Sequence, residues 1–348
     1  PSSRVYLERD IYLIEELASL DGYDKVPVKT STRRIMDRHE YRIRKLCADY
    51  LVSRGCFDTL NYSFIDPIMM EKLGYKDEAP ELQMIRLINP QSSTMSAMRT
   101  SLVPQLLQNL AYNLNHGERN IKLFELGKIY HKTKEPMHLS AVLTGQNRDE
   151  HWQDKASLVS AAYVKGIIEE LFAMYNVQAY TAEQANLPFL SPSESAAYVL
   201  NGTPLGFYGK LTASVAENFG IDLIDLKQDV WLLHVFVDNL VEITRNSQIV
   251  YTPISRFPAV TRDISFLIGN SIRFSEIEAC IKSIDSELIK ELSVFDEYRG
   301  KQIPEGFRSL SLHIKFQDKE KTLTDERIDQ LVDSVIKKLM LTWQINMR

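Results

Sequence analysis

The chain has 348 residues, of which 44% are hydrophobic and 25% charged, a composition typical of globular proteins. Its length predicts two or three domains. The formal net charge of -5 argues against a protein that binds polyanions over its whole surface, although it is compatible with a local RNA site. No apolar run approaches the roughly 18 residues that a membrane-spanning helix needs, so we expect no membrane partner.

Cysteine usage indicates the compartment. Cys47, Cys56 and Cys280 fit neither a zinc pattern nor a disulfide framework, so we interpret them as reduced thiols of a cytoplasmic protein. The chain begins at Pro1 rather than at methionine, and its first residues are typical of the middle of a protein. We therefore expect a fragment of a longer chain.

Residues 1–28 predict one short helix, which ends at Gly22 and is followed by Pro27. This segment is too small to fold alone, so we interpret it as the remnant of a preceding domain.

Residues 29–248 predict an α+β module with a mostly antiparallel sheet. Apolar residues recur at helical spacing over residues 39–54, 102–114 and 159–175. Alternating patterns predict strands near 59–64, 123–130, 139–145, 197–200, 205–211 and 231–237.

Residues 249–348 predict the order strand, helix, strand, strand, helix, strand, which is typical of a split βαβ sheet with two helices on one face. The strands fall near 264–268, 292–295, 310–316 and 341–347, and the helices over 275–284 and 324–339. The other face of such a sheet is free to present side chains to RNA. Ser311, His313 and Lys315 alternate with buried positions on one of these strands.

Basic and aromatic residues in this last block are the candidate RNA contacts, because single-stranded RNA is bound by stacking, by hydrogen bonds to base edges and by cations near phosphates. An ordinary solvated sheet face is the alternative explanation. The candidates are Arg256, Arg262, Tyr298, Arg299, Lys301, Arg308 and Lys315.

Motifs for catalysis are not found: the sequence contains neither a phosphate-binding loop nor a nucleophile elbow nor a zinc-binding helix motif. Glu15 and Glu16 are the one carboxylate pair that is a candidate for Mg²⁺. Adjacent helical residues point about 100° apart, so the pair alone is poorly placed to hold one ion. A solvated helix face is the favoured alternative.

Three runs in the last block resemble the C-terminal anticodon-binding domain of bacterial phenylalanyl-tRNA synthetase beta chains. They are Arg256-Phe257-Pro258-Ala259-Val260-Thr261-Arg262-Asp263, Phe295-Asp296-Glu297-Tyr298-Arg299-Gly300 and Thr322-Leu323-Thr324-Asp325-Glu326. Upstream, Met98-Arg99-Thr100-Ser101-Leu102 and Leu123-Phe124-Glu125-Leu126-Gly127-Lys128 resemble the catalytic-like module of the same family, and Ile14-Glu15-Glu16 with Gly22-Tyr23-Asp24 resembles the segment before it.

The resemblance implies a class II synthetase-like module without catalysis, over residues 29–248, and a ferredoxin-like βαββαβ domain, over 249–348. It further implies an (αβ)₂ heterotetramer that charges tRNA(Phe) with ATP and Mg²⁺ at an active site in the alpha chain. We then expect no cofactor on this chain itself. The helix over residues 39–54 is the expected contact with the alpha chain.

Two departures from known patterns bear on chemistry. A working class II site needs arginines on the nucleotide, whereas strand 123–130 offers Glu125 and Lys128, and the strand around Gly206 ends in Lys210. The family also places two aspartates beside its glutamate pair, and these positions are Tyr6 and Tyr12 here. The sequence therefore predicts lost catalysis and an incomplete metal site.

Two other functions remain open. A stand-alone pseudo-synthetase that regulates another enzyme would have the same module, and so would an active class II ligase with an unusual site. The missing arginines oppose the second of these alternatives.

Overall fold

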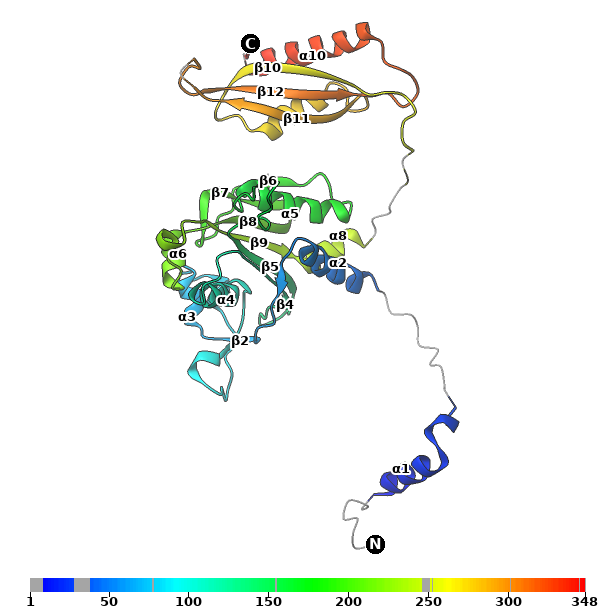
Figure 1. Ribbon diagram of the computed structural model, residues 1–348, viewed down its shortest axis with the longest axis vertical. Coiled ribbons are helices and arrows are strands. Elements are labelled where there is room, and N and C mark those ends of the chain that lie inside the picture. Colours follow the sequence, from blue (N-terminus) through cyan, green and yellow to red (C-terminus); the bar gives the residue numbers. More distant parts are fainter. Residues whose placement is uncertain are drawn as a thin grey trace. The chain divides into compact units, whose positions relative to one another are not determined.

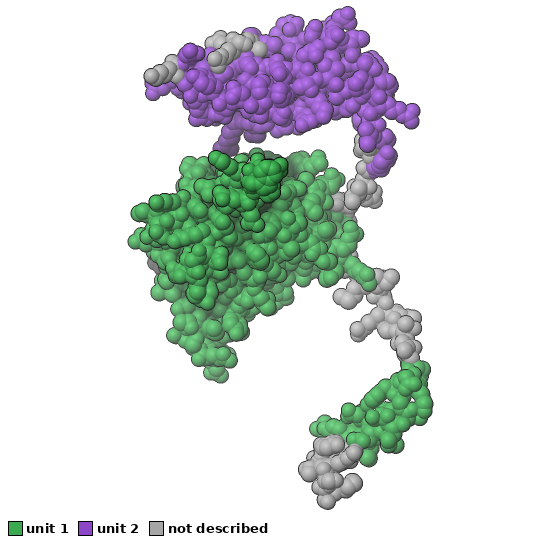
Figure 2. Space-filling view, in the orientation of Figure 1, with its two compact units in different colours: residues 1–249 green, residues 250–348 purple. Residues whose placement is uncertain are grey.

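The computed structural model describes residues 9–27, 38–76, 78–153, 155–245, 251, 253–300, 302–343 and 345–347. The chain divides into two compact units, residues 1–249 and 250–348 (Figure 2). Both predicted domain boundaries, after residues 28 and 248, lie outside the described residues. Within the described ranges, no helix is long and apolar enough to cross a membrane.

The first unit begins with the helix α1, Asp10–Asp21, and the 3₁₀ turn η1, Tyr23–Lys25. Gly22 stands between them with a φ of 101°, a left-handed conformation that glycine adopts without strain. The predicted end of this helix at Gly22 is therefore confirmed.

A seven-stranded sheet forms the centre of the first unit, in the order β1-β4-β5-β9-β8-β7-β6 (Figure 1). Only the pairing of β1 with β4 is parallel among these described strands, so the predicted mostly antiparallel sheet is confirmed. The strands are β1 (Phe57–Asp58), β4 (Ile121–Lys128), β5 (Met137–Thr144), β6 (Thr181–Glu183), β7 (Leu190–Leu200), β8 (Thr203–Leu211) and β9 (Val230–Phe236).

Helices cover both faces of this sheet, because its strands alternate apolar residues to the two sides. Phe124, Leu139 and Leu233 belong to one core, whereas Val142 and Leu232 belong to the other. The first core contains α2 (His39–Ser53), α5 (Ala161–Met174) and α8 (Val237–Thr244). The second contains α3 (Ile68–Lys72), α4 (Val103–Asn115), α6 (Ala213–Asn218) and α7 (Leu223–Leu226). Short elements complete the unit: β2 (Phe64–Ile65), β3 (Ala97–Met98), η2 (Pro80–Leu82) and η3 (Ser93–Met95).

The second unit is a four-stranded sheet in the order β11-β12-β10-β13. Its two helices pack on one face, where they share a core with the inward side chains of the strands (Figure 1). The predicted βαββαβ order is confirmed. The elements are β10 (Val260–Gly269), α9 (Phe274–Lys282), β11 (Ile289–Tyr298), β12 (Phe307–Phe316), α10 (Asp325–Trp343) and β13 (Asn346–Met347).

Two predicted strands differ from the structure. The strand expected over 59–64 is interrupted between β1 and β2. Thr59 bonds to the carbonyl of Phe124 through both its backbone N–H and its hydroxyl, whereas Asn61 reaches β4 through its side chain. The strand expected over 341–347 is shorter, because α10 continues to Trp343 and only Asn346 and Met347 pair with β10. The apolar spacing of α10 outweighs the short alternating pattern at its end.

Candidate nucleic-acid interface

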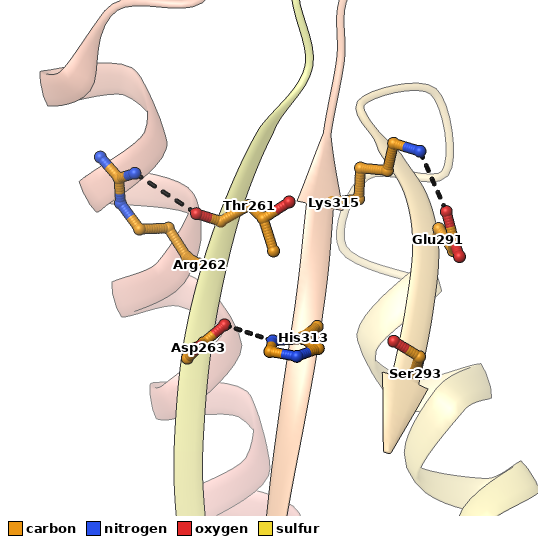
Figure 3. A pocket seen from close by; sticks show the side chains of 7 residues that line it. All are labelled: Thr261, Arg262, Asp263, Glu291, Ser293, His313 and Lys315. Atoms are coloured by element: carbon orange, nitrogen blue, oxygen red, sulfur yellow. Dashed lines mark hydrogen bonds and ion pairs between the residues drawn. The ribbon is translucent and has the colours of Figure 1, made fainter. Parts of the chain in front are cut away.

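The face of the second sheet opposite its helices presents a row of polar side chains. Because side chains alternate along a strand, Ile264 and Leu312 enter the core while their neighbours point to the open face. The register sets Asp263 opposite His313 and Thr261 opposite Lys315. The shallow site of Figure 3 is lined by Thr261, Arg262, Asp263, Glu291, Ser293, His313 and Lys315.

An aromatic stack stands beside this site. The rings of Phe295 and His313 lie 4.0 Å apart at 18°, and the side chain of Phe295 is 48% exposed. An irregularity in β11 between Val294 and Asp296 places Phe295 there, because a bulge redirects a side chain. The pair offers a flat π-surface of the kind on which an unpaired base stacks.

Asp263 orients the histidine of this stack. Its Oδ1 lies 2.5 Å from Nδ1 of His313, and a carboxylate accepts hydrogen bonds, so the Nδ1–H donates. The other ring nitrogen, Nε2, makes no hydrogen bond to the residues that the structure describes, so it can meet an external partner. Asp263 and His313 therefore form a directed hydrogen-bonding group within the stacking surface.

Small residues form the floor next to the stack. Ser265 and Ser311 face each other across β10 and β12, with 2.8 Å between their hydroxyl oxygens. Tyr298 is 41% exposed at the end of β11, and a Cβ on Gly300 would collide with its hydroxyl. The glycine therefore permits the observed position of the Tyr298 ring.

The cations around this face are balanced by neighbouring carboxylates. Lys315 Nζ lies 3.1 Å from Glu291 Oε2, and Arg299 Nη2 lies 2.7 Å from Glu297 Oε1. Such exposed ion pairs contribute little to stability, so a phosphate can replace the carboxylate at small cost. The face is suited to stacking and hydrogen bonding more than to bulk electrostatic attraction.

The structure separates the predicted contact residues into groups. Tyr298, Arg299 and Lys315 lie on β11 and β12 or directly after them, near the stack. Arg262 has the opposite strand parity and pairs with Asp325 at the start of α10, at 2.8 Å. Arg308 also has the core-side parity and donates to the carbonyl of Ile272 at 2.7 Å.

Two further candidates lie apart from the stack. Arg256 is exposed in the segment before β10, and Lys301 lies outside the described residues. Asp263, Phe295 and His313 also belong to this face and were not among the residues predicted from the sequence. The alternation that places His313 beside Lys315 was a signal for one of them, whereas the position of Phe295 depends on the irregularity in β11.

The candidate metal residues lie on α1. Glu15 is exposed and Glu16 is half-buried, whereas Tyr6 lies outside the described residues. Among the residues that the structure describes, no group of three or more His, Cys, Asp or Glu side chains is placed to hold a metal ion. The arrangement at Glu15 and Glu16 thus supplies two oxygen-bearing side chains, fewer than a protein site for Mg²⁺ usually combines with substrate and water.

The comparisons with known proteins agree over both units. The family described as the phenylalanyl tRNA synthetase beta chain CLM domain matches residues 25–226. The phenylalanine–tRNA ligase beta subunit of Geobacter metallireducens is 32% identical over 98% of this chain. This chain belongs to the phenylalanine–tRNA ligase beta subunit family. The ferredoxin-fold anticodon binding domain family matches residues 255–348.

Other members of the beta subunit family show the same extent of similarity. The proteins of Syntrophotalea carbinolica and Thermotoga maritima are 34% and 33% identical over 98% and 97% of this chain. The match covers 43% and 42% of those two proteins and 44% of the Geobacter protein. The chain therefore spans less than half the length of these beta subunits.

Solved structures of other synthetases are also similar to the chain. Pyrrolysyl-tRNA synthetase from Desulfitobacterium hafniense is 13% identical, with a TM-score of 0.47, and the match covers 70% of this chain and 82% of that one. The sequence family matches and the observed sheets together confirm the predicted α+β class with a ferredoxin-like second unit.

In this beta subunit chain, the side chains that stand where the sequence lacks catalytic arginines are held by protein partners. Glu125 is bound by Arg99 on one oxygen, at 2.6 Å, and by Asn61 on the other, at 2.7 Å. Lys128 pairs with Glu135 at 3.0 Å. These polar groups are therefore already engaged within the module.

Lys210 is engaged in the same way, since its Nζ lies 3.2 Å from Glu194 and 2.9 Å from Asp229. These carboxylates raise the pKa of Lys210, because they stabilise its charged form. The lysine is held as a cation between two strands and a loop.

Proposed function

We propose that this chain is the non-catalytic C-terminal part of a phenylalanine–tRNA ligase beta subunit, and that it binds the anticodon region of tRNA(Phe). The complete enzyme is proposed to be a cytoplasmic (αβ)₂ heterotetramer that uses ATP and Mg²⁺ in the alpha chain. Membership of the beta subunit family supports this function over a stand-alone regulatory pseudo-synthetase.

The observation that carries RNA binding is the Phe295–His313 stack with Asp263 behind it, on the sheet face opposite the two helices. A base stacked on these rings would place its polar edge near Nε2 of His313 and the hydroxyl groups of the serine floor. Tyr298, Arg299 and Lys315 surround this position and supply a further ring and two cations for the adjoining backbone.

The remaining predicted residues, which lie apart from the stack, have other roles in this proposal. Arg262 and Arg308 hold α10 and the loop before α9 through their present contacts, which makes them positioning residues of the sheet. Arg256 is assigned to the approaching RNA backbone because it is exposed immediately before β10. Lys301 keeps the same assignment from its place in the sequence.

The tRNA site is tested with the complete ligase that contains this chain. Phe295→Ala removes a stacking surface that contributes roughly 1–3 kcal/mol per base, so tRNA(Phe) should bind about tenfold more weakly or worse. Leu341→Ala is the matched control, because Leu341 is an exposed apolar residue on the helix side of the same unit. Fluorescence anisotropy measures the affinity of both variants for tRNA(Phe), and that of the double variant Tyr298→Ala/Arg299→Ala. Unchanged affinity of both Phe295→Ala and Tyr298→Ala/Arg299→Ala would contradict the site.

Docking on the alpha chain is supported by an inverted surface segment that runs from the end of β1 into β2. Leu60, Tyr62 and Phe64 point outward, at 99%, 69% and 37% exposure, whereas the side chain of Asn61 turns inward to Glu125. Surface strands normally show the reverse pattern, with polar residues outward. An exposed apolar row of this kind is typical of a protein interface.

Partly buried polar contacts hold this segment in place. Gln105 donates to the carbonyl of Tyr62 at 2.7 Å, and the backbone of Arg99 donates to the carbonyl of Ser63 at 2.9 Å. Asn109 donates to Asn61 at 3.0 Å. A rigid apolar row loses little entropy on binding, so we propose it as the alpha-chain contact.

The helix α2 directly precedes this segment and remains part of the proposed contact. Its apolar residues Ile43, Cys47 and Leu51 face the core, whereas Tyr41 and Val52 are exposed. These two side chains, eleven residues apart, lie on the same side of α2, and we propose them as the contribution of the helix to the contact. Glu15 and Glu16 are proposed only as a low-affinity Mg²⁺ site, because the usual aspartates are replaced by Tyr6 and Tyr12.

A further inference from the structure

A cavity of about 280 Å³ lies in the first unit, between β5, β8 and β9 and the loop that joins β4 to β5. Its walls combine aromatic and imidazole rings. Phe207 stacks on His234, with centroids 4.7 Å apart at 5°, and His138 meets Phe236 edge-on at 5.1 Å. Tyr75 and Phe189 line the same space. Neither the tRNA site nor the alpha-chain contact uses this cavity.

A chain of hydrogen bonds ends at the cavity. Ser140 Oγ lies 2.7 Å from Nδ1 of His234, and Nε2 of His234 lies 3.0 Å from Nδ1 of His138. Ser140 is fully buried, and His234 and His138 are only 4% and 9% exposed. Buried polar groups of this kind need partners, so the direction of the proton donors along the chain is constrained.

The serine sets that direction. Among the described residues, His234 is the one hydrogen-bond partner of the Ser140 hydroxyl, and an unsatisfied buried hydroxyl proton is costly. The hydroxyl therefore donates to Nδ1 of His234. It follows that Nε2–H of His234 donates to Nδ1 of His138, because a neutral imidazole has one donor and one acceptor.

This sequence of donors leaves Nε2 of His138 protonated. That N–H makes no hydrogen bond to any residue that the structure describes, and His138 lines the cavity. Burial keeps both rings neutral, since it lowers the pKa of His138 to about 4 and that of His234 well below its ordinary value. The cavity thus presents a neutral donor beside stacked rings.

We propose that this cavity binds a planar heteroaromatic ligand whose ring nitrogen or carbonyl accepts a hydrogen bond from Nε2 of His138. The volume is close to the lower end of small-molecule pockets, and a dry cavity of roughly 150 Å³ already holds benzene. One or two fused rings therefore fit. Free nucleobases and nucleosides share this chemistry, and the test distinguishes them.

The experiment measures ligand binding to the 348-residue chain by saturation-transfer NMR and calorimetry. The probes 7-azaindole and indole have the same shape, but only 7-azaindole carries a ring-nitrogen acceptor. We expect 7-azaindole to bind about tenfold more tightly, the effect of one buried hydrogen bond. Adenine and adenosine are then compared: binding of adenine alone indicates a base-sized ligand, and equal binding of both indicates that the ribose leaves through the mouth of the cavity.

Two variants test whether the ligand binds in the cavity beside His138. His138→Phe keeps a ring in the wall but removes the donor, so the preference for 7-azaindole should disappear. His116→Phe is the matched control, since His116 is exposed at the end of α4, and it should keep the preference. Circular dichroism checks folding. Should His138→Phe not fold, the ¹⁵N shift of the His138 ring in the wild-type chain gives the answer, because 7-azaindole should move it and indole should not.

Two results would overturn the proposal. One is equal affinity for 7-azaindole and indole in the wild-type chain, which would mean that no acceptor is recognised. The other is the absence of binding by 7-azaindole, adenine and adenosine at millimolar concentration.

Discussion

Gly127 leaves the space that the guanidinium of Arg99 occupies: a Cβ at this glycine would collide with Nη2 of Arg99. Arg99 in turn forms an ion pair with Glu125, in which the two side chains are only 4% and 2% exposed. The backbone of β4 thereby supplies both the carboxylate and the opening beside it. The Nε–H of Arg99 also donates a hydrogen bond to the carbonyl of Lys128, at 2.9 Å.

We therefore expect Gly127→Ala to destabilise the first unit. The added methyl group would push Arg99 from Glu125 and leave a buried charge without its partner, at a cost of about 3–5 kcal/mol. Urea unfolding measures the change. Gly166→Ala is the matched control, because a Cβ there meets no atom within 4 Å and alanine favours the helix α5 by roughly 0.5–1 kcal/mol. Equal stabilities of the two variants would refute the packing argument.

The buried histidine pair predicts a pH dependence of stability. The pKa of His138 is lowered from 6.5 to about 4 by burial, and the pKa of His234 is lowered as well. The unfolded chain therefore binds more protons between these values, and stability falls as the pH falls from 6.5 toward 4. The expected slope is up to about 1.4 kcal/mol per pH unit for each histidine.

This slope is measured by urea unfolding of the first unit at about pH 7 and about pH 5. The variant His138→Phe should have a smaller slope than the wild-type chain, and His116→Phe should keep the wild-type slope. A wild-type chain equally stable at both values would show that the two imidazoles gain protons in the folded state.

The open sheet face predicts a specific salt dependence. Lys315→Ala in the complete ligase should lower the slope of log affinity for tRNA(Phe) against log salt by about 1, because one phosphate contact is lost. Lys282→Ala is matched to it, since Lys282 also pairs with a glutamate, Glu278, but on α9. Filter binding over a range of salt gives both slopes. A slope changed equally by both variants would place the RNA elsewhere.

The apolar row between β1 and β2 predicts an assembly defect. Leu60→Asp should weaken association with the alpha chain by at least about tenfold, because it removes the burial of a leucine and introduces a charge into the contact. Ile224→Asp is the control, since Ile224 is 87% exposed on α7. Co-purification and analytical ultracentrifugation measure association. A tetramer retained by Leu60→Asp would exclude this row from the contact.

In the class II synthetase-like module, over residues 29–248, the side chains at the expected catalytic positions are held by protein partners. We therefore predict that this chain forms no phenylalanyl-adenylate. Glu125 and Lys210 are held by Arg99 and by two carboxylates, and no arginine stands at these positions to stabilise the nucleotide. ATP–pyrophosphate exchange by the purified chain, with phenylalanine and Mg²⁺, should equal the background. Exchange that increases with the concentration of the chain would establish an active site here.

Local patterns predicted most elements of the fold. The alternation of Leu310, Leu312 and Ile314 identified β12, and the helical spacing of Ile328, Leu331 and Val335 identified α10. These patterns report burial within a few residues, so the elements and the βαββαβ order followed from them. The end of α10 did not, because the apolar residues after Leu339 fit a helix and a strand equally well.

The candidate site was only partly predictable for the same reason. Tyr298 and Lys315 were visible as a ring and a cation on expected strands, but the stack of Phe295 on His313 needs the register of two strands and an irregularity in one of them. Arg262 and Arg308 were grouped with these residues from composition alone, whereas both have the core-side strand parity and Arg262 lines only the rim of the open site.

The sequence by itself determined the succession of elements, the family and the absence of arginines at the expected catalytic positions, since each depends on the order of residues along the chain. Only the tertiary structure decided which distant groups meet. Arg99 and Glu125 are 26 residues apart, and His138 and His234 are 96 apart. Their pairing follows from the order of strands in a sheet, which local preferences do not encode.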